Sequence, residues 1–192
     1  MNPTTELPPT AALILIDIQQ GFDDPKWGTR NNPEAESNAA ALLSAWRLSQ
    51  RPVIHVQHAS RHENSPLHPS RPGHNIREIV APLAHETVFK KQENSAFIGT
   101  NLEAHLRENG IDTLVICGLT TPHCVSTSTR MAGNLGFRTL LVADAVAAFA
   151  LKDHLGREYD AETVHAVSLA TLHDEFALIT TTKDMLAAAT LA

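Results

Sequence analysis

The chain has few of the residues that mark several classes of protein. Only two of its 192 residues are cysteine, and aromatic residues make up 5%. Two cysteines exclude a disulfide framework, and their scarcity predicts a reducing, cytoplasmic environment. Apolar runs such as residues 11–16, 113–117 and 140–143 are far shorter than a membrane span, so we expect no membrane association. The net charge of −6, with no basic stripe, argues against nucleic-acid binding.

The opening residues, MNPTTELPPT, contain neither a basic segment nor an apolar core and do not resemble a signal peptide. The chain as a whole has 43% apolar and 19% charged residues, which is typical of a globular protein long enough to bury a full core. We therefore expect residues 1–192 to form a single domain. Residues 59–85 differ from the rest because they are rich in proline, histidine and arginine, which predicts a long irregular loop on the substrate side.

Short apolar runs alternate along the chain with helical patterns. The apolar runs indicate strands at residues 11–17, 52–58, 113–118, 138–144 and 176–181. The helical patterns cover residues 34–50, 100–110, 122–136, 160–174 and 183–191. Continuous runs of Val, Ile and Leu indicate strands buried on both faces of a parallel sheet. The repeating order of strand and helix predicts an α/β fold, a three-layer αβα domain with a doubly wound, mostly parallel, Rossmann-like sheet.

Polar residues stand where several of these strands end. In such folds the ligand crevice lies beyond the carboxyl ends of the strands. Asp17 closes the first predicted strand, His58 closes the second, and residues 118–124 follow a central strand. Asp17 could equally be a helix cap or one partner of a structural ion pair. His55 and His58 are three positions apart and face opposite sides of a strand, so only His58 is expected to reach the crevice.

Cys124 lies in the stretch GLTTPHCVSTSTRMAG, near the start of a predicted helix. Pro122 suits the first helical position, which makes Thr121 the expected N-cap and Cys124 the third helical residue. The unpaired amides and the dipole of a helix N-terminus stabilise a thiolate, so we expect a lowered pKa for Cys124. Cys124 is therefore a candidate nucleophile, with a small packing residue as the alternative reading.

A nucleophilic cysteine usually needs a base and a group that stabilises charge. His123 is adjacent in sequence, but successive helical residues point about 100° apart, so His123 is not expected to face the thiol. Asp17 could serve as the base. One of the two lysines in FKKQENSAF could turn inward.

Three separated stretches resemble the isochorismatase-like cysteine hydrolase superfamily: LILIDIQQGF, KKQENSAFIGTNLEAHLRENGIDTLVICG and GLTTPHCVSTSTRMAGNLGF. The likeness extends to ETVHAVSLATLHDEFALITT and is weakest in residues 59–85. The resemblance implies the isochorismatase-like hydrolase fold, with a six-stranded parallel sheet flanked by helices. It also implies assembly as a homodimer or homotetramer.

The resemblance implies a catalytic triad in which Asp17 is the base, Lys91 stabilises charge and Cys124 is the nucleophile. It further implies a cis peptide between Leu119 and Thr120, with the backbone amides of Thr120 and Cys124 forming an oxyanion hole. The implied reaction is hydrolysis of a small molecule's C–N bond, in an amide, carbamoyl or lactam-like group, through a thioester. This chemistry needs no cofactor.

The resemblance also places Phe22 in the substrate site, although Phe22 could equally be a core residue. We expect four residues to line the site: Phe22, Asn94, Leu119 and His58. Trp27 and Phe149 are further candidates. His165 and His173 are expected to be solvated or at an interface.

Two alternatives to this interpretation are a nicotinamidase-type metalloenzyme and a protein without catalytic activity. Nicotinamidases bind a metal through an Asp-x-His sequence at the end of the second strand, but in HVQHAS the aspartate position holds Gln57 or another residue without a carboxylate. We therefore predict no metal site, and we interpret His62, His68 and His74 as polar loop residues that could close over the crevice. The other alternative is a non-catalytic small-molecule binding protein on the same fold. The complete triad argues against it.

Overall fold

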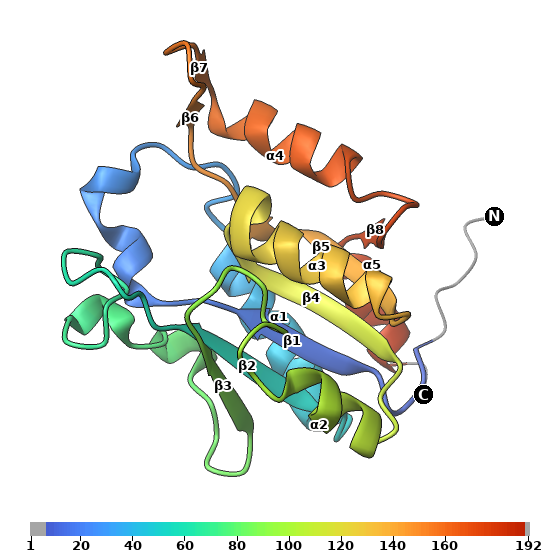
Figure 1. Ribbon diagram of the computed structural model, residues 1–192. Helices are drawn as coiled ribbons and strands as arrows, with labels where there is room; N and C mark the ends of the chain where they lie inside the picture. Colours follow the sequence, from blue (N-terminus) through green and yellow to red (C-terminus); the bar gives the residue numbers. More distant parts are fainter. Residues whose placement is uncertain (1–6, 191–192) are drawn as a thin grey trace.

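A computed structural model describes residues 7–190 (Figure 1). Its main sheet has six strands in the order β3-β2-β1-β4-β5-β8, and every neighbouring pair is parallel. The strands are β1 (Ala12–Ile16), β2 (Val53–His58), β3 (Thr87–Lys91), β4 (Thr113–Leu119), β5 (Arg138–Ala147) and β8 (Leu178–Thr180). The helices are α1 (Ala35–Leu48), α2 (Leu102–Glu108), α3 (Ser126–Asn134), α4 (Ala161–Ala170) and α5 (Thr182–Thr190). The predicted six-stranded αβα fold is confirmed.

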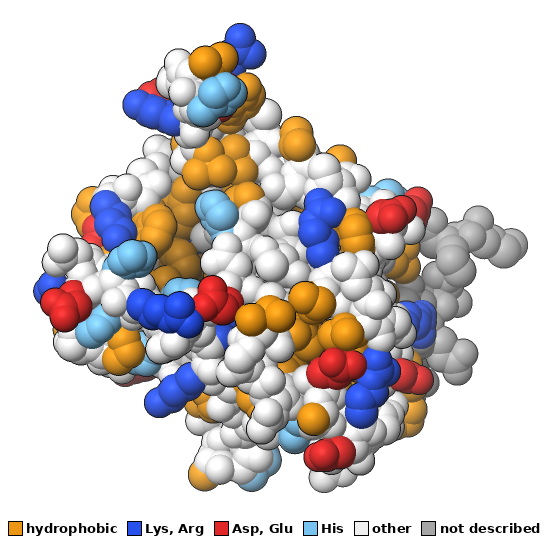
Figure 2. All heavy atoms as spheres, in the orientation of Figure 1, with side chains coloured by type: hydrophobic (Ala, Val, Ile, Leu, Met, Phe, Trp, Pro, Cys, Tyr) orange, Lys and Arg blue, Asp and Glu red, His pale blue; other side chains and the backbone are white. Residues whose placement is uncertain are grey.

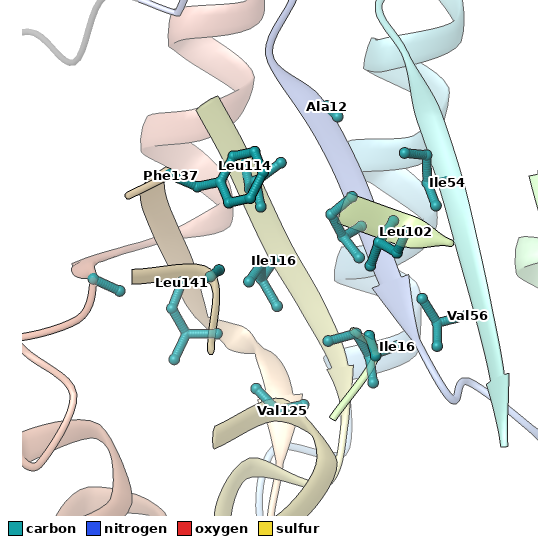
Figure 3. Packing of buried hydrophobic residues seen from close by; sticks show 14 of the residues in the cluster. Ala12, Ile16, Ile54, Val56, Leu102, Leu114, Ile116, Val125, Phe137 and Leu141 are labelled. Carbon is teal, nitrogen blue, oxygen red and sulfur yellow. The ribbon is translucent and has the colours of Figure 1, made fainter. Parts of the chain in front are cut away.

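The central strands contribute side chains to both faces of the sheet. Along β1, Ala12, Ile14 and Ile16 pack into a cluster with residues of α2 and α3 (Ala12 and Ile16 are labelled in Figure 3). Leu13 and Leu15 pack into the opposite cluster with residues of α1 and α5. Figure 1 shows these two helix layers on opposite sides of the sheet. Burial on both faces explains why the strand reads as one continuous apolar run.

Three features of the strands were not predicted from the sequence. Strand β3 lies at one edge and has mixed exposure, so it lacks an apolar run. A short antiparallel hairpin, β6 (Leu151–Lys152) with β7 (Glu158–Tyr159), projects from the body of the molecule (Figure 1). The predicted end of β5 at Asp144 is wrong, because the strand continues to Ala147. The Asp144 carboxylate instead accepts hydrogen bonds from the amide and hydroxyl of Thr182, at the start of α5.

Residues 59–85 form the predicted long loop, which contains two short 3-10 turns, η3 (Pro72–His74) and η4 (Glu78–Val80), and an isolated bridge from Ile76 to Gln19. The loop is tied to the end of β2 by His74, whose Nδ1 lies 3.1 Å from the carbonyl oxygen of His58 and 3.2 Å from that of Leu67. Within residues 7–190, the structure contains no helix with the length and apolarity needed to cross a bilayer.

Candidate active site

The carboxyl ends of β1 and β4 lie side by side in the middle of the sheet. Their register pairs Ile16 with Gly118, and a Cβ atom added to Gly118 would lie 2.0 Å from the carbonyl oxygen of Ile16. Gly118 also has a φ of +129°, which only glycine adopts readily. Asp17 follows β1 with a φ of +51°, in a region that aspartate tolerates better than most residues. This close approach brings together the residues that follow the two strands.

Cys124 lies in a π-helical turn, η5 (Thr121–Val125), which leads directly into α3. The expectation that Thr121 is the N-cap and Cys124 the third helical residue is wrong. Thr120 is the N-cap, and Cys124 is the fourth residue of the turn. The peptide bond between Leu119 and Thr120 is cis, as the resemblance implied.

The ammonium group of Lys91 lies at the centre of the site. The side chains of Lys91 and Asp17 are both 0% exposed, and Nζ donates a hydrogen bond to Asp17 Oδ2 over 2.7 Å. Nζ also lies 3.2 Å from Cys124 Sγ, 3.1 Å from His58 Nδ1 and 3.1 Å from the carbonyl oxygen of Glu93. The structure thus brings the three predicted triad residues into contact from the end of β1, the end of β3 and η5.

Strand register explains why Lys91 turns inward. Lys91 and His58 are partners on neighbouring parallel strands, so their side chains project from the same face of the sheet. Lys90, one residue earlier, is exposed, as alternation requires. His55 is on the opposite face, where its Nε2 lies 3.0 Å from Glu86 Oε2. Of the two strand histidines, His58 therefore reaches the site.

Burial and two charged neighbours determine the protonation of Cys124. Burial, assisted by the Asp17 carboxylate, raises the pKa of the Cys124 thiol to about 12, although Lys91 acts in the opposite direction. The expected lowering of this pKa by the helix terminus is wrong, because the cost of burying a thiolate at a residue only 9% exposed outweighs it. Asp17 Oδ1 is buried and has no hydrogen-bond partner among the described residues, so it has a lone pair for the thiol proton.

A group of side chains at this site also has the spacing of metal ligands. One ligand atom each from Asp17, His58 and Cys124 lies within 4.8 Å of the others. However, Nζ of Lys91 lies 2.7 to 3.2 Å from an atom of each of these side chains. A divalent cation would have to share that space with a buried ammonium, so these residues do not fit a metal while Lys91 occupies the position.

Comparison with known proteins identifies the family. The Isochorismatase domain profile matches residues 11–184. The chain belongs to the isochorismatase family. The isochorismatase family protein YrdC of Bacillus subtilis is 54% identical over 175 residues, which cover 91% of this chain and 94% of that protein. An isochorismatase-family crystal structure from Chromobacterium violaceum has a TM-score of 0.96 at 45% identity, with both chains fully covered. Maleamate amidohydrolase of Pseudomonas putida is 32% identical over 155 residues, 70% of this chain and 71% of that protein.

Two of the predicted substrate residues of this isochorismatase-family hydrolase lie beside the triad. His58 contacts Lys91 as described above. Asn94 is exposed, and its Oδ1 lies 3.9 Å from Cys124 Sγ, so Asn94 lies between the thiol and the surface of the protein.

The other predicted substrate residues belong to an apolar cluster. Phe22, Leu119 and Phe149 are buried together, and Trp27 packs against them. The ring centroids of the three aromatic residues lie 5.4 to 6.3 Å apart. Figure 2 shows a hollow below the β6–β7 hairpin with hydrophobic side chains along one wall. Because Leu119 directly precedes Thr120, the N-cap of η5, this cluster adjoins the turn that holds Cys124.

Two polar residues near the site were missed or misassigned. Gln19 is 0% exposed; its Oε1 accepts from the His58 amide over 2.9 Å, and its Nε2 donates to the His58 carbonyl over 3.1 Å. The signal for Gln19 was its place two residues after Asp17, in the motif that carried the resemblance. The expectation for His165 is wrong: it is buried, and its Nδ1 lies 3.0 Å from the Thr121 hydroxyl. No sequence pattern pointed to that contact.

Proposed function

We propose that this isochorismatase-family hydrolase cleaves a C–N bond in a small-molecule amide, carbamoyl or lactam-like substrate through a thioester on Cys124. The observation that carries this proposal is the buried contact of the Lys91 ammonium with both Asp17 and Cys124. The family relative named maleamate amidohydrolase supports amide chemistry. Action without a metal, assembly as a homodimer or homotetramer, and a cytoplasmic location belong to the same proposal.

In the first half of the reaction, Cys124 Sγ attacks the substrate carbonyl carbon while Asp17 Oδ1 takes the thiol proton. The two events occur together, because a thiol pKa of about 12 leaves little thiolate at neutral pH. The amides of Thr120 and Cys124 donate to the developing oxyanion, since amides in the first turn of a helix lack partners within it. Lys91 keeps its charge beside both Asp17 and the sulfur throughout.

The tetrahedral intermediate then collapses as its C–N bond breaks. The leaving nitrogen takes the proton held by Asp17 and departs as ammonia or an amine. Water next attacks the thioester carbonyl, with Asp17 accepting one of its protons. When the C–S bond breaks, that proton returns to the sulfur, which restores the thiol and releases a carboxylic acid. The net change is amide plus water to acid plus amine.

The aromatic cluster favours a substrate whose acyl group, next to the scissile bond, is apolar. Phe22, Trp27 and Phe149 offer ring surface beside the catalytic turn. Arg30 and Arg77 are already paired with Glu36 and Asp23 respectively, and Lys26 Nζ lies over the Trp27 ring, 4.8 Å from its centroid. We therefore expect apolar amides to be better substrates than amides whose acyl group carries a carboxylate.

A screen of small amides tests the proposal. Nicotinamide, benzamide, butyramide and maleamate are incubated with the wild type, Cys124→Ala, Asp17→Asn and the matched control Cys117→Ala, and ammonia release is measured. The Cys124 and Asp17 variants should lose at least about a thousandfold in rate, because a triad acts as a unit. Cys117→Ala should remain active, because Cys117 lies within β4 and 0% exposed. Undiminished hydrolysis by folded Cys124→Ala protein would refute the mechanism, and the absence of any turnover or acyl adduct would favour a binding protein.

A further inference from the structure

The hydrogen bonds of the Lys91 ammonium identify a fourth participant in the site. The group has three N–H bonds but four neighbours within 3.2 Å: Asp17, Glu93, Cys124 and His58. The carboxylate and the Glu93 carbonyl can only accept, whereas a neutral thiol sulfur is a weak acceptor. The third strong acceptor available to Lys91 is therefore the Nδ1 lone pair of His58.

His58 is held firmly in place to supply that lone pair. Its backbone amide and carbonyl are both bonded by the buried side chain of Gln19, and the His74 ring also reaches its carbonyl oxygen. Its side chain projects from the same face of the sheet as its register partner Lys91. Because a protonated Lys91 must donate, Nδ1 of His58 carries no proton, and the single ring proton is assigned to Nε2 from this hydrogen bond.

We propose that His58 is a positioning residue, whose neutral imidazole accepts a hydrogen bond from Lys91 and so keeps the ammonium between Asp17 and Cys124. This inference rests on the proposed function, in which Lys91 balances the charge on both partners. It differs from the initial expectation that His58 binds substrate, because the bond it makes is to the triad itself.

Protonation of His58 would disable this arrangement. Both ring nitrogens would then be donors, and Nδ1–H would face the Lys91 ammonium at 3.1 Å. Burial and the Lys91 charge lower the pKa of His58 and keep it neutral at pH 7. The other charged or titratable groups facing His58 are Asp17 after β1, Glu93 after β3 and His74 of η3, with Cys124 across the site.

Nuclear magnetic resonance tests the tautomer without any substrate. Two-dimensional ¹⁵N–¹H spectra of the histidine rings, assigned with His58→Asn, should show His58 as the Nε2–H tautomer with a midpoint below its ordinary pKa of 6.5. In Lys91→Met the midpoint should rise, because a neighbouring positive charge has been removed. An Nδ1–H tautomer, or a midpoint that is unchanged in Lys91→Met, would overturn the proposal.

Acylation of Cys124 by p-nitrophenyl acetate tests the consequence for the nucleophile. The p-nitrophenolate burst is followed against pH for the wild type, His58→Asn, His58→Leu and the loop control His68→Asn. Asparagine offers Oδ1 as an acceptor where histidine offers Nδ1 but does not titrate, so His58→Asn should keep most of the rate at pH 7.5. His58→Leu should lose about 10- to 100-fold, the range for a hydrogen bond to a charged group.

The acid side of the pH profile separates His58 from Asp17. In the wild type and in His68→Asn the burst rate should fall as His58 is protonated, and this fall should be absent or displaced in His58→Asn. An unchanged acid limb in His58→Asn, or equal rates in the Asn and Leu variants, would overturn the proposal. Failure of wild-type Cys124 to be acylated at all would instead count against the proposed function, leaving the tautomer measurement as a separate test of His58.

Discussion

Replacing Lys91 with methionine should destabilise the protein by about 3–5 kcal/mol, the cost of removing one partner of a buried ion pair. Both side chains of the Lys91–Asp17 pair are 0% exposed and their charged atoms are 2.7 Å apart. Methionine fills a similar volume but leaves the Asp17 carboxylate without a cation, and Oδ1 of that carboxylate has no other partner within residues 7–190. For a chain of this length the melting temperature should fall by about 6–20 °C.

A double-mutant cycle separates the contribution of the ion pair to the free energy of unfolding from that of side-chain packing. Asp17→Asn is the suitable partner variant, because asparagine tolerates the φ of +51° at this position. The double variant Asp17→Asn/Lys91→Met lacks both charges, so its loss should be smaller than the sum of the single losses by about 2 kcal/mol or more.

Urea unfolding followed by tryptophan fluorescence measures these free energies, and Trp46, which is 0% exposed, provides the signal. The matched control is Lys90→Met, at the exposed neighbouring position, which should change stability by no more than about 0.5 kcal/mol. A Lys91→Met variant within 1 kcal/mol of the wild type, or single losses that simply add, would show that the pair is not buried and coupled as described.

Three further outcomes follow from the structure. Iodoacetamide should modify Cys124 more slowly than free cysteine at pH 7.5, and the rate should rise with pH, because the pKa of the Cys124 thiol is about 12. Cys117, at 0% exposure, should remain unmodified, and intact-mass analysis of the folded protein measures both outcomes. Glu86→Gln should lower stability at pH 7. The ion pair with Arg47 of α1 lowers the pKa of Glu86 to about 2. The difference between the variant and the wild type in free energy of unfolding, measured with urea, should therefore shrink as pH falls from 4.5 toward 2. Gly118→Ala should abolish soluble expression because its Cβ would overlap the β1 backbone, whereas Gly99→Ala, with positive φ but open space, should fold.

The parts of the fold that could be predicted were those in which burial leaves a pattern along the chain. β1 and β4 are buried at every position, so their runs of apolar residues indicated a parallel sheet. β3 was missed as a strand because an edge strand needs little apolar sequence, and only Lys91 of its five residues is buried. The hairpin strands β6 and β7 have two residues each, too few for any periodicity.

The candidate site was predicted residue by residue through resemblance, but its electrostatics were not. Helix geometry alone gave the wrong direction for the Cys124 pKa, because burial of the thiol, together with the carboxylate of Asp17, raises that pKa, and both depend on residues remote in sequence. The contact between His58 and Lys91 depends on the register of two strands, which no local pattern reveals. The same holds for His165, whose partner Thr121 lies on a different element.

The strand order has a consequence for synthesis of the chain on the ribosome. β1 is made first but lies between β2 and β4, so one of its edges stays unpaired until residue 119 has emerged. A nascent chain shorter than this carries an exposed, wholly apolar strand edge, the kind of surface that pairs with other chains. Translation that pauses before β4 should therefore favour aggregation, while chaperones that cover residues 12–16 should raise the yield of folded protein.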